Sequence, residues 1–455
     1  MFESVLVANR GEIARRIVRT VKAMGLRAIV VHSEADIDLP FVREADETYL
    51  LGPSAPAESY LDIAKVMEAC RATGAQAVHP GYGFLSESAA FARAVMDAGL
   101  VWIGPSPDAI ERMGDKINAR NLMERAGVPV AAGTREPVTG LPQALTSAAE
   151  IGYPVMVKTA GGGGGIGMGV AHDEAGLTKA FETASRAAER FGGGGSGAGP
   201  AILLERYIER ARHVEVQILG LADGTVVALG ERDCSVQRRH QKVVEESPSP
   251  GITPELRERM LAAAVRAGEA VGYRGAGTVE CLVDAGEQDF VFLEMNTRLQ
   301  VEHPVTELVT GIDLVEQQLR VAAGEPVTFP VASRGHAVEP DGHAIEMRVY
   351  AEDPKRFFPG PGKIGVWEEP SGPGIRLDSG YVAGNTVTPF YDPLMAKLCV
   401  HGADRDEALA RAREAVAAFR IEGPKNNLAF CAELLDNAEF TSGDYDTGLI
   451  ARMRS

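Results

Sequence analysis

The chain has 455 residues, of which 45% are hydrophobic and 24% are charged, and this length corresponds to roughly three domains. The composition excludes a mainly disordered chain, and no apolar run approaches the ~18 residues that a membrane span requires. The formal net charge of −17 disfavours a non-specific nucleic-acid or anionic-membrane surface. Five scattered cysteines without Cys-x-x-Cys spacing, and an N-terminus without a signal-peptide layout, indicate a cytoplasmic protein with neither a disulfide framework nor a zinc site.

The first ~110 residues alternate short apolar runs with stretches of helical periodicity. This alternation predicts a Rossmann-like parallel sheet with helices on its faces, ending near Met113. The apolar runs are Ser4–Ala8, Ala28–Val31, Ala75–His79 and Val101–Ile103, and the helical positions are Ile13, Ile17, Val21 and Met24, then Ile63, Met67 and Cys70.

The middle of the chain predicts a helix at Lys116–Gly127 and then a small separate lobe. In this lobe a strand at Pro154–Lys158 precedes the glycine run Gly161–Gly165, and a returning strand at Met168–Ala171 precedes a helix at Glu174–Arg190. A second glycine-rich stretch, Gly192–Gly199, is typical of a flexible loop. Beyond residue ~205 the pattern becomes β-rich, with strands expected at Val214–Leu219, Val226–Glu231, Gly277–Val283 and Phe290–Asn296.

The last ~110 residues predict further strands and then a long helix. Asp404 and Glu407 form a capping signature at the start of this helix. Its expected buried stripe consists of Ala408, Ala412, Val416 and Phe419.

The glycine run indicates a phosphate-binding hairpin. Its spacing formally matches the dinucleotide fingerprint, but no helix begins inside the glycines, and Lys158 precedes them, which excludes a P-loop. Exposed backbone N–H groups next to a strand-borne lysine still suit phosphate. A glycine loop that binds no ligand is the alternative.

The strands around residue 287 predict a metal site. Paired as a symmetric hairpin about Glu287, they place Glu280 opposite Glu294 and Leu282 opposite Phe292. Two ionised carboxylates ~5 Å apart repel by ~3 kcal/mol at an effective dielectric of ~20, and a divalent cation turns this repulsion into ligation. Oxygen ligands, to which Asn296 adds another, indicate Mg²⁺.

If the second strand continues, period-two spacing adds Arg298, Gln300 and Glu302 to the face that carries Glu294 and Asn296. The opposite face then carries Met295, Thr297, Leu299 and Val301. Such a polar row beside a metal predicts the floor of an active site. A solvated polar face on an edge strand is the alternative.

A cluster of basic residues occurs at 237–242, in the sequence Gln-Arg-Arg-His-Gln-Lys. Nucleic-acid binding is disfavoured, because the cluster has no interleaved aromatic residues and the net charge is negative. Anion binding beside a nucleotide is the better interpretation, and a plain surface loop is the alternative.

Together these motifs resemble those of the biotin carboxylase family of ATP-grasp enzymes, over nearly the whole chain. ATP-grasp ligases in general share the glycine hairpin and the Glu-x-Asn strand, whereas MNTRLQVEHPVTE and CSVQRRHQKVVEE are specific to biotin-dependent carboxylases. Other matching segments are VLVANRGEIA, VHPGYGFLSE, IGPSPDAIERMGDK, PVMVKTAGGGGG, RHVEVQILG, GHAIEMRVYAEDP, FFPGPGKI and YDPLMAKL.

The resemblance implies a mixed α/β and α+β fold in three parts. These are an N-terminal domain at 1–113, an ATP-grasp domain at 114–330 with a mobile glycine-rich lid at about 131–205, and a C-terminal mixed β/α domain at 331–455. Family members usually carry a basic residue where this chain has Ile166, and often another near Gly169. Their absence leads us to expect weaker contacts between the lid and the phosphates.

The resemblance also implies roles for individual residues. The phosphates of ATP would bind to Lys116, Lys158, Gly163, Gly164 and Gly165. Its adenine would bind to Glu205, Tyr207 and Ile208, with Leu282 also at the nucleotide. Its ribose and phosphates would face His213, Gln237 and His240. Mg²⁺, or Mn²⁺, would bind to Glu280, Glu294 and Asn296. Bicarbonate would be held by Lys242, Arg298, Gln300 and the Val301 backbone, with Glu302 as the general base, and Arg348 would face the biotin ureido oxygen.

The implied activity is that of an ATP-dependent ligase. MgATP, bicarbonate and carrier-linked biotin give carboxybiotin, ADP and phosphate through carboxyphosphate, which is the first half-reaction of a biotin-dependent carboxylase. The acyl-CoA type used in fatty acid biosynthesis is the expected one, and a type that carboxylates a keto acid such as pyruvate is the alternative. The chain contains no Ala-Met-Lys-Met biotin-attachment segment, so the expected partners are a biotin carboxyl carrier protein and a carboxyltransferase subunit, besides a second copy in a homodimer. The alternatives are an ATP-grasp ligase joining a carboxylate to an amine and a nucleotide-binding regulatory subunit without turnover.

Overall fold

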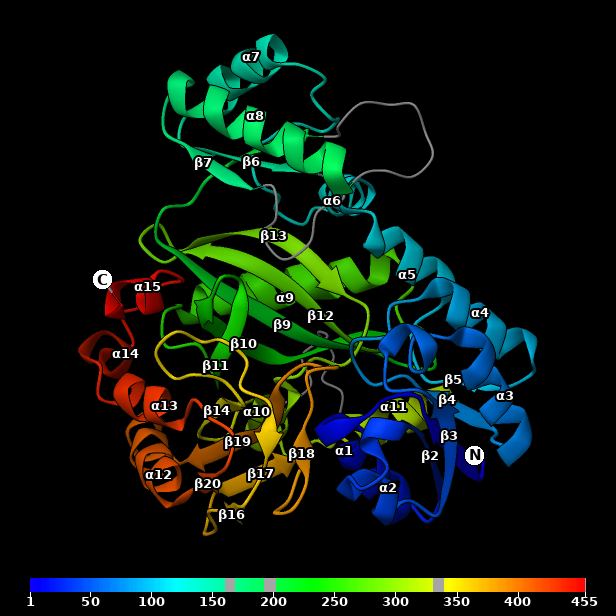
Figure 1. Ribbon diagram of the computed structural model, residues 1–455. Coiled ribbons are helices and arrows are strands. Elements are labelled where there is room, and N and C mark those ends of the chain that lie inside the picture. Colours follow the sequence, from blue (N-terminus) through cyan, green and yellow to red (C-terminus); the bar gives the residue numbers. More distant parts are fainter. Residues whose placement is uncertain (160–167, 192–201, 330–338, 455) are drawn as a thin grey trace.

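The structure is a computed structural model that describes residues 1–159, 168–191, 202–329 and 339–454. Figure 1 shows an N-terminal α/β region, a small lobe at the top of the view and a large helix-covered sheet between the lobe and the C-terminal helices. The predicted mixed α/β and α+β fold is confirmed. The run Gly161–Gly165, Ile166 and the whole stretch Gly192–Gly199 lie outside the described residues. In the described part of the chain, no helix is both long and apolar enough to cross a bilayer.

The N-terminal region contains the predicted parallel sheet, with strand order β3-β2-β1-β4-β5. Because the order reverses between β1 and β4, the loops that follow these two strands meet at one edge of the sheet, where ligands commonly bind. The strands are β1 (Ser4–Val7), β2 (Arg27–Ser33), β3 (Glu47–Gly52), β4 (Ala77–His79) and β5 (Val101–Trp102), and the helices are α1 (Gly11–Ala23), α2 (Pro40–Glu44), α3 (Ile63–Thr73), α4 (Ala89–Asp97) and α5 (Pro107–Gly114), with 3-10 turns at Glu34–Asp36 and Pro56–Glu58.

The small lobe is connected to this region through α6 (Lys116–Arg125) and has its own apolar core. A three-stranded antiparallel sheet of order β7-β6-β8 is covered by two helices. Its elements are β6 (Val155–Thr159), β7 (Gly169–Ala171), β8 (Ile202–Arg206), α7 (Leu141–Ile151) and α8 (Glu174–Phe191). The predicted strand, returning strand and helix on either side of the glycine run are therefore confirmed.

An eight-stranded antiparallel sheet forms the centre of the molecule, in the order β13-β12-β9-β10-β11-β14-β19-β17. Strands from before and after residue 331 are hydrogen-bonded within it, because β11 pairs with β14. Its strands are β9 (Ala211–Gly220), β10 (Val226–Arg238), β11 (Gln241–Ser247), β12 (Gly275–Asp284), β13 (Asp289–Asn296), β14 (His343–Tyr350), β17 (Ile375–Ser379) and β19 (Leu394–Gly402).

The remaining elements are helices, several of which pack against this sheet, and two short strand pairs. Asp404 accepts a hydrogen bond from the Glu407 backbone N–H and caps α12, and the predicted stripe that includes Ala408 and Ala412 is buried, as expected. These elements are α9 (Pro254–Ala270), α10 (His303–Thr310), α11 (Leu314–Ala322), α12 (Arg405–Ala418), α13 (Leu428–Leu435), α14 (Ala438–Ser442), α15 (Leu449–Met453), and the pairs β15 (Gly362–Lys363) with β18 (Thr386–Val387) and β16 (Val366–Glu368) with β20 (Arg420–Glu422).

The β12–β13 hairpin confirms one predicted pairing and corrects another. Glu280 lies opposite Glu294, as predicted, but Leu282 pairs with Val291 and not with Phe292. The register shifts by one residue after Glu280 because Leu293 is an extra residue in β13, a β-bulge. Symmetry about the turn could not reveal this insertion.

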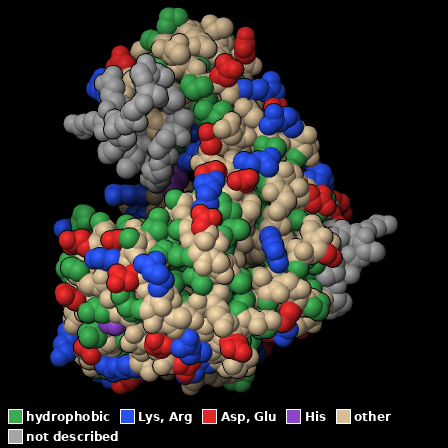
Figure 2. Space-filling model, turned by 90° about the vertical axis from the view of Figure 1, so that its right-hand side faces the viewer, with side chains coloured by type: hydrophobic (Ala, Val, Ile, Leu, Met, Phe, Trp, Pro, Cys, Tyr) green, Lys and Arg blue, Asp and Glu red, His purple; other side chains and the backbone are tan. Residues whose placement is uncertain are grey.

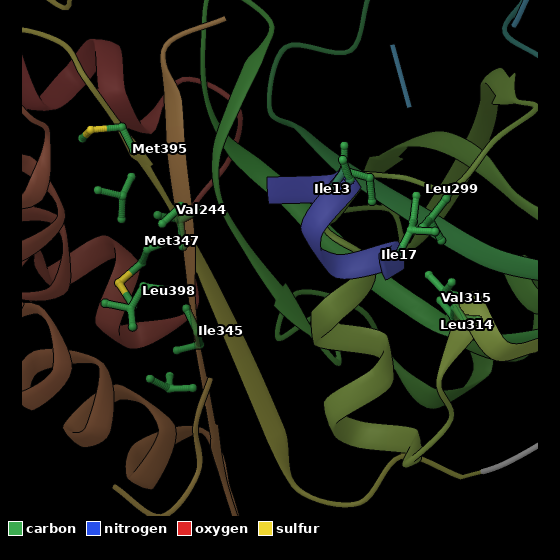
Figure 3. Packing of buried hydrophobic residues seen from close by; sticks show 14 of the residues in the cluster. Ile13, Ile17, Val244, Leu299, Leu314, Val315, Ile345, Met347, Met395 and Leu398 are labelled. Atoms are coloured by element: carbon green, nitrogen blue, oxygen red, sulfur yellow. The ribbon is translucent and has the colours of Figure 1, made fainter. Parts of the chain in front are cut away.

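The segment after β13 is held by a single buried leucine. The predicted strand continuation is wrong, because regular β13 ends at Asn296. Leu299 is nevertheless fully buried and packs in the same cluster as Ile13 and Ile17 of α1, with Leu314 and Val315 of α11 beside it (Figure 3). Burial of Leu299 therefore fixes the segment that presents its polar neighbours.

Glu246 on β11 anchors the C-terminal helices to the sheet. Its buried carboxylate accepts hydrogen bonds from Arg405 (2.7 and 3.0 Å) and Tyr445 and lies 2.6 Å from His343 Nε2. Burial by itself raises the pKa of Glu246, but His343 and Arg405 outweigh it and lower the pKa to about 2. The ionised carboxylate therefore stabilises the folded protein.

We expect Glu246→Gln to lower the free energy of unfolding at pH 7 by about 3 kcal/mol, measured by urea unfolding. Because the folded-state pKa lies below the unfolded-state value, this stabilisation is present above about pH 5, and the difference between variant and wild type should shrink to roughly half by pH 3. Glu433→Gln, which removes only an exposed ion pair with Arg454, is the control and should cost less than about 1 kcal/mol. Equal effects of the two substitutions would contradict the anchoring role.

Candidate functional site

A cavity of about 750 Å³ lies between the N-terminal region, the β10–β11 hairpin, the end of β13 and β14. Figure 2 shows the molecule hollowed between the small lobe and the rest of the chain, with basic side chains at the edge of the hollow. The cavity is lined by many of the residues proposed from the sequence: His213, His240, Lys242, Glu280, Glu294, Asn296, Arg298, Gln300, Val301, Glu302 and Arg348.

Lys242 is the central cation of the cavity. Its ammonium nitrogen lies 2.6 Å from a Glu215 oxygen, 2.9 Å from Glu280 Oε1 and 2.6 Å from Glu302 Oε1. Burial by itself lowers the pKa of Lys242, but the three carboxylates raise it well above its usual value. The lysine therefore stays charged and can meet an anion without first gaining a proton.

Glu302 is fully buried at the start of α10. Its two carboxylate oxygens have different partners, since Lys242 donates to Oε1 and Arg348 donates to Oε2 at 2.9 Å. Burial opposes ionisation, yet Lys242 and Arg348 hold the pKa of Glu302 well below its ordinary range. Because these two cations lower the pKa, a longer distance from either of them would make Glu302 a stronger base.

Glu280 and Glu294 fit a magnesium site. The pKa of Glu294 is raised, first by burial and then by repulsion from Glu280, and a cation between the two carboxylates removes that repulsion. Asn296 Nδ2 donates to Glu280 Oε1 at 2.9 Å, so the carboxamide lies at the same place. Two carboxylates and an amide oxygen are the hard ligands that Mg²⁺ prefers, and the three residues therefore fit this ion.

Two further clusters have metal-like composition among the described residues: His213 with Glu215 and Glu280, and Glu215 with Cys234 and Glu302. Lys242 contacts a carboxylate of each cluster within 3 Å. The lysine ammonium therefore supplies the positive charge that both clusters require.

The polar row predicted after β13 does face the cavity, although this segment is not a strand. Arg298 donates to Gln300 Oε1 at 2.7 Å and to Asn296 Oδ1 at 3.0 Å, and its Nε donates to Glu87 at 3.0 Å. Gln300 Nε2 in turn donates to Glu280 Oε1 at 2.9 Å. The side chains of Asn296, Arg298 and Gln300 therefore face the cavity as they would in a regular strand. Their hydrogen bonds and the burial of Leu299 hold them in this arrangement.

The backbone of Val301 is fixed from the C-terminal region. Lys397, on β19, is fully buried and donates to the Val301 carbonyl oxygen at 2.9 Å. It also lies 3.2 Å from Glu12 Oε2 of α1. Lys397 lies in the quoted segment YDPLMAKL, but the sequence alone gave no reason to assign it a role.

One group of candidates lies beside Glu280 and consists of His213, Gln237 and Leu282. His213 Nε2 is 2.9 Å from Glu280 Oε2, and its Nδ1 is 3.4 Å from Gln237 Nε2. Leu282 is the cross-strand neighbour of His213. His240, in contrast, lies at the exposed β10–β11 turn with a positive φ of 67°.

The remaining candidates that the structure describes lie in or near the small lobe, and none of them lines the cavity. Lys158 on β6 forms an ion pair with Glu205 on β8 at 2.5 Å, and Tyr207 and Ile208 follow β8. Lys116 begins α6, close enough for its charge to lower the pKa of Glu294. Gly163, Gly164 and Gly165 lie outside the described residues.

Glu215 is the main site residue that was not predicted. Its buried carboxylate joins Lys242 to Arg232, whose guanidinium nitrogens lie 2.6–2.7 Å from Glu215 Oε1. Glu215 shares a strand face with His213, two residues earlier in the quoted segment RHVEVQILG. This alternation is the signal that could have found it.

The N-terminal region supplies a wall of the cavity that was also not predicted. Residues 9–13 follow β1 and residues 82–84 follow β4, so the reversal of strand order places both loops at the cavity. Arg10 is already neutralised by Asp36 at 2.6 Å and lies over the Tyr391 ring at 4.2 Å. A positive φ of 65° at Gly11 permits the turn from β1 into α1.

Three family models match the chain in succession. A model for the biotin carboxylase N-terminal domain matches residues 1–110, one for the ATP-binding domain of the carbamoyl-phosphate synthase L chain matches residues 115–329, and one for the biotin carboxylase C-terminal domain matches residues 346–452.

Curated relatives and solved structures resemble the chain over almost its full length. Biotin carboxylase 2 of Bacillus subtilis is 49% identical, with 99% of each chain covered, and the biotin carboxylase of Pseudomonas aeruginosa is 47% identical, with 97% of this chain and 96% of that one covered. The biotin carboxylase of Campylobacter jejuni, solved as a beta-gamma-ATP complex, has a TM-score of 0.93 at 43% identity and 99% coverage of each chain. The biotin carboxylase domain dimer of the Hydrogenobacter thermophilus 2-oxoglutarate carboxylase, solved with MgADP, ADP and bicarbonate, has a TM-score of 0.91 at 40% identity, with 99% of this chain and 98% of that one covered.

Proposed function

The chain belongs to the biotin carboxylase family of ATP-dependent ligases, and from this premise we propose which of its residues perform each part of the reaction. The protein uses MgATP and bicarbonate to carboxylate biotin, giving ADP, phosphate and carboxybiotin. The observation that carries the residue assignments is the convergence of Lys242, Glu302 and Arg348, from three separate segments, with Glu302 within 3 Å of both cations.

For ATP, we assign the adenine to Glu205, Tyr207 and Ile208, with Leu282 also at the nucleotide. We assign the ribose and phosphates to His213, Gln237, His240, Lys116, Lys158, Gly163, Gly164 and Gly165. The supporting geometry is that β6 and β8 place Lys158 beside Glu205, while Lys116 approaches the acidic pair on β12 and β13. An ATP molecule that reaches from Glu205 to the acidic pair on β12 and β13 has its terminal phosphates at the cavity.

For the metal, we assign Glu280, Glu294 and Asn296 to Mg²⁺. When bound, this ion offsets phosphate charge and orients the terminal phosphate for attack. Glu280 also accepts hydrogen bonds from Lys242, Asn296 and Gln300. A Glu280 carboxylate that bound the ion would leave Lys242 and Gln300 available to the substrate anion.

We expect Glu294→Gln to raise the Mg²⁺ concentration required for half-maximal activity by roughly tenfold or more and to lower turnover. Glu280→Gln should do the same and also disturb Lys242, because Glu280 contacts this lysine. Mg²⁺ titration of ADP release measures both effects, and Glu287→Gln at the tip of the same hairpin is the control. A wild-type Mg²⁺ dependence in both variants would remove the metal assignment.

For bicarbonate, we assign Lys242, Arg298, Gln300 and the Val301 backbone as the binding groups and Glu302 as the general base. Lys242 and Arg298 carry the charge that an anion requires, and Glu302 lies 2.6 Å from Lys242, so a bicarbonate at this lysine is within reach of the base. As its proton passes to Glu302, the bicarbonate oxygen attacks the γ-phosphate, the bond between this phosphate and ADP breaks, and carboxyphosphate forms. Carboxyphosphate then gives its carboxyl group to the ureido nitrogen of biotin, whose proton leaves with the phosphate. Arg348 stabilises the negative charge that develops on the ureido oxygen of biotin.

The decisive test of this function is ADP release measured with bicarbonate and free biotin varied independently. We expect release that requires bicarbonate and is accelerated by biotin. An ATP-grasp carboxylate–amine ligase would require an amine in place of biotin, and a regulatory subunit would bind ATP without releasing ADP.

The division of the chain into 1–113, 114–330 and 331–455 remains our proposal, supported by the separate parallel sheet before α5 and the separate core of the small lobe. We further propose that the protein is cytoplasmic, forms a homodimer and acts with a biotin carboxyl carrier protein and a carboxyltransferase subunit. Dimerisation is supported by the dimeric relative from Hydrogenobacter thermophilus. Co-purification of a biotinylated partner tests the carrier assignment.

A further inference from the structure

We propose that Glu245 is a positioning residue that keeps Arg348 aimed at the biotin site while Glu302 carries a proton. This inference rests on the proposed roles of Glu302 and Arg348. It assigns a function to a buried carboxylate that touches none of the three substrates in the proposed reaction.

Arg348 is held by two carboxylates, both of which contact its Nη2. Its Nε and Nη2 both lie 2.6 Å from Glu245 Oε1, and Nη2 also lies 2.9 Å from Glu302 Oε2. Glu245 and Glu302 are both fully buried. Both contacts are therefore shielded from water, where a charge-assisted hydrogen bond is strong.

The two carboxylates differ in what happens to them during the reaction. Glu302 is also bound to Lys242, faces the cavity and accepts the bicarbonate proton. Once protonated, it is neutral, and its hydrogen bond to Arg348 loses the assistance of the negative charge. Glu245 contacts Arg348 from β11, does not line the cavity and takes no part in this proton transfer.

The position of Glu245 in the sheet explains why it can serve as the second anchor. It lies directly opposite Glu346 on β14, and Arg348 is two residues further along the same face of β14. The diagonal from Glu245 to Arg348 lies within reach of long side chains on adjacent strands. Glu245 therefore holds the guanidinium against the rigid sheet and fixes the direction in which its other donors point.

Glu346 provides a matched control on the neighbouring strand. Its side chain is as fully buried as that of Glu245. Among the described residues, the only hydrogen bond to the Glu346 carboxyl group comes from Cys399 at 3.5 Å. Both carboxylates leave one oxygen without a hydrogen-bond partner in the described part of the chain. Burial raises the pKa of Glu346 well above its ordinary value. Glu346→Gln thus changes an equally buried carboxyl group without removing a contact to Arg348.

The test compares two rates in the full chain: ATP cleavage with bicarbonate but no biotin, and carboxylation of free biotin. In Glu245→Gln the amide oxygen still accepts a hydrogen bond from Arg348, but the charge is lost. We expect biotin carboxylation to fall by roughly tenfold or more, mainly in kcat, while biotin-free ATP cleavage stays within about twofold. Glu346→Gln should leave the ratio of the two rates unchanged.

A double-mutant cycle with Arg348→Ser completes the test. If Glu245 acts through Arg348, adding Glu245→Gln to Arg348→Ser causes no further loss of biotin carboxylation. Additive losses, or equal losses of both rates in Glu245→Gln, would overturn the inference. If Arg348→Ser loses biotin carboxylation selectively but Glu245→Gln has wild-type rates, this inference alone is overturned. If Arg348→Ser shows no selective loss of biotin carboxylation, the proposed role of Arg348 is overturned as well.

Discussion

Glu302→Gln should reduce bicarbonate-dependent ATP cleavage by about 10²–10⁴-fold in a protein that still folds and binds ATP. The amide has the shape of the carboxyl group but cannot accept the bicarbonate proton. Because Lys242 and Arg348 hold the pKa of Glu302 well below its ordinary range, the wild-type residue is ionised in the ligand-free protein at any pH near neutral. The loss in kcat/KM for bicarbonate, which reports the enzyme before this anion binds, should therefore be the same across that range.

Steady-state ADP release and isothermal titration with ATP measure the two halves of this prediction on one preparation. Glu287→Gln, an exposed carboxylate in the β12–β13 loop, serves as the control for loss of a single negative charge. Activity of Glu302→Gln within a few-fold of the wild type would exclude Glu302 as the base. Loss of ATP binding together with activity would instead place the residue in the nucleotide site.

Arg348→Ser should separate the two rates by orders of magnitude. The guanidinium is a fixed charge that can stabilise the enolate-like ureido oxygen of biotin, and removal of one such donor costs about 10²–10³-fold. Biotin carboxylation should fall by that factor, whereas biotin-free ATP cleavage should survive, because Glu302 keeps its contact with Lys242. Equal losses of both rates would contradict the enolate role.

The ratio of the two rates, and not the melting temperature, tests this second prediction. Arg348 does bridge β11 and β14 through Glu245, so Arg348→Ser leaves a buried carboxylate without its cation and should lower the melting temperature. A lower melting temperature is therefore expected whether Arg348 acts on biotin or serves only as a structural salt bridge. The ratio of the two rates is the discriminating quantity, and Arg348→Lys, which retains the charge without the guanidinium geometry, should recover stability before it recovers carboxylation.

Local patterns in the sequence determined much of the fold and the metal half of the site. Alternating apolar runs and helical periodicity located the parallel sheet, the small lobe and α12, because each depends on neighbours close in the chain. The hairpin placed Glu280 opposite Glu294, since a short turn fixes which residues face each other. Period-two spacing also identified Arg298, Gln300 and Glu302 as residues of one face, although a buried Leu299 and hydrogen bonds maintain that face in place of a strand.

Only the tertiary structure decided the rest of the charge network. The bulge at Leu293 shifts Leu282 away from Phe292, and no local pattern marks such an insertion. Lys242 meets Glu215 and Glu302, and Arg348 meets Glu245 and Glu302, across 27 to 103 positions of sequence. A buried charge requires a partner of opposite charge. Which charged residues are buried, and which meet, depends on which strands are neighbours in the sheet. The strand order depends in turn on packing over the whole molecule, which the spacing of residues along the chain does not encode.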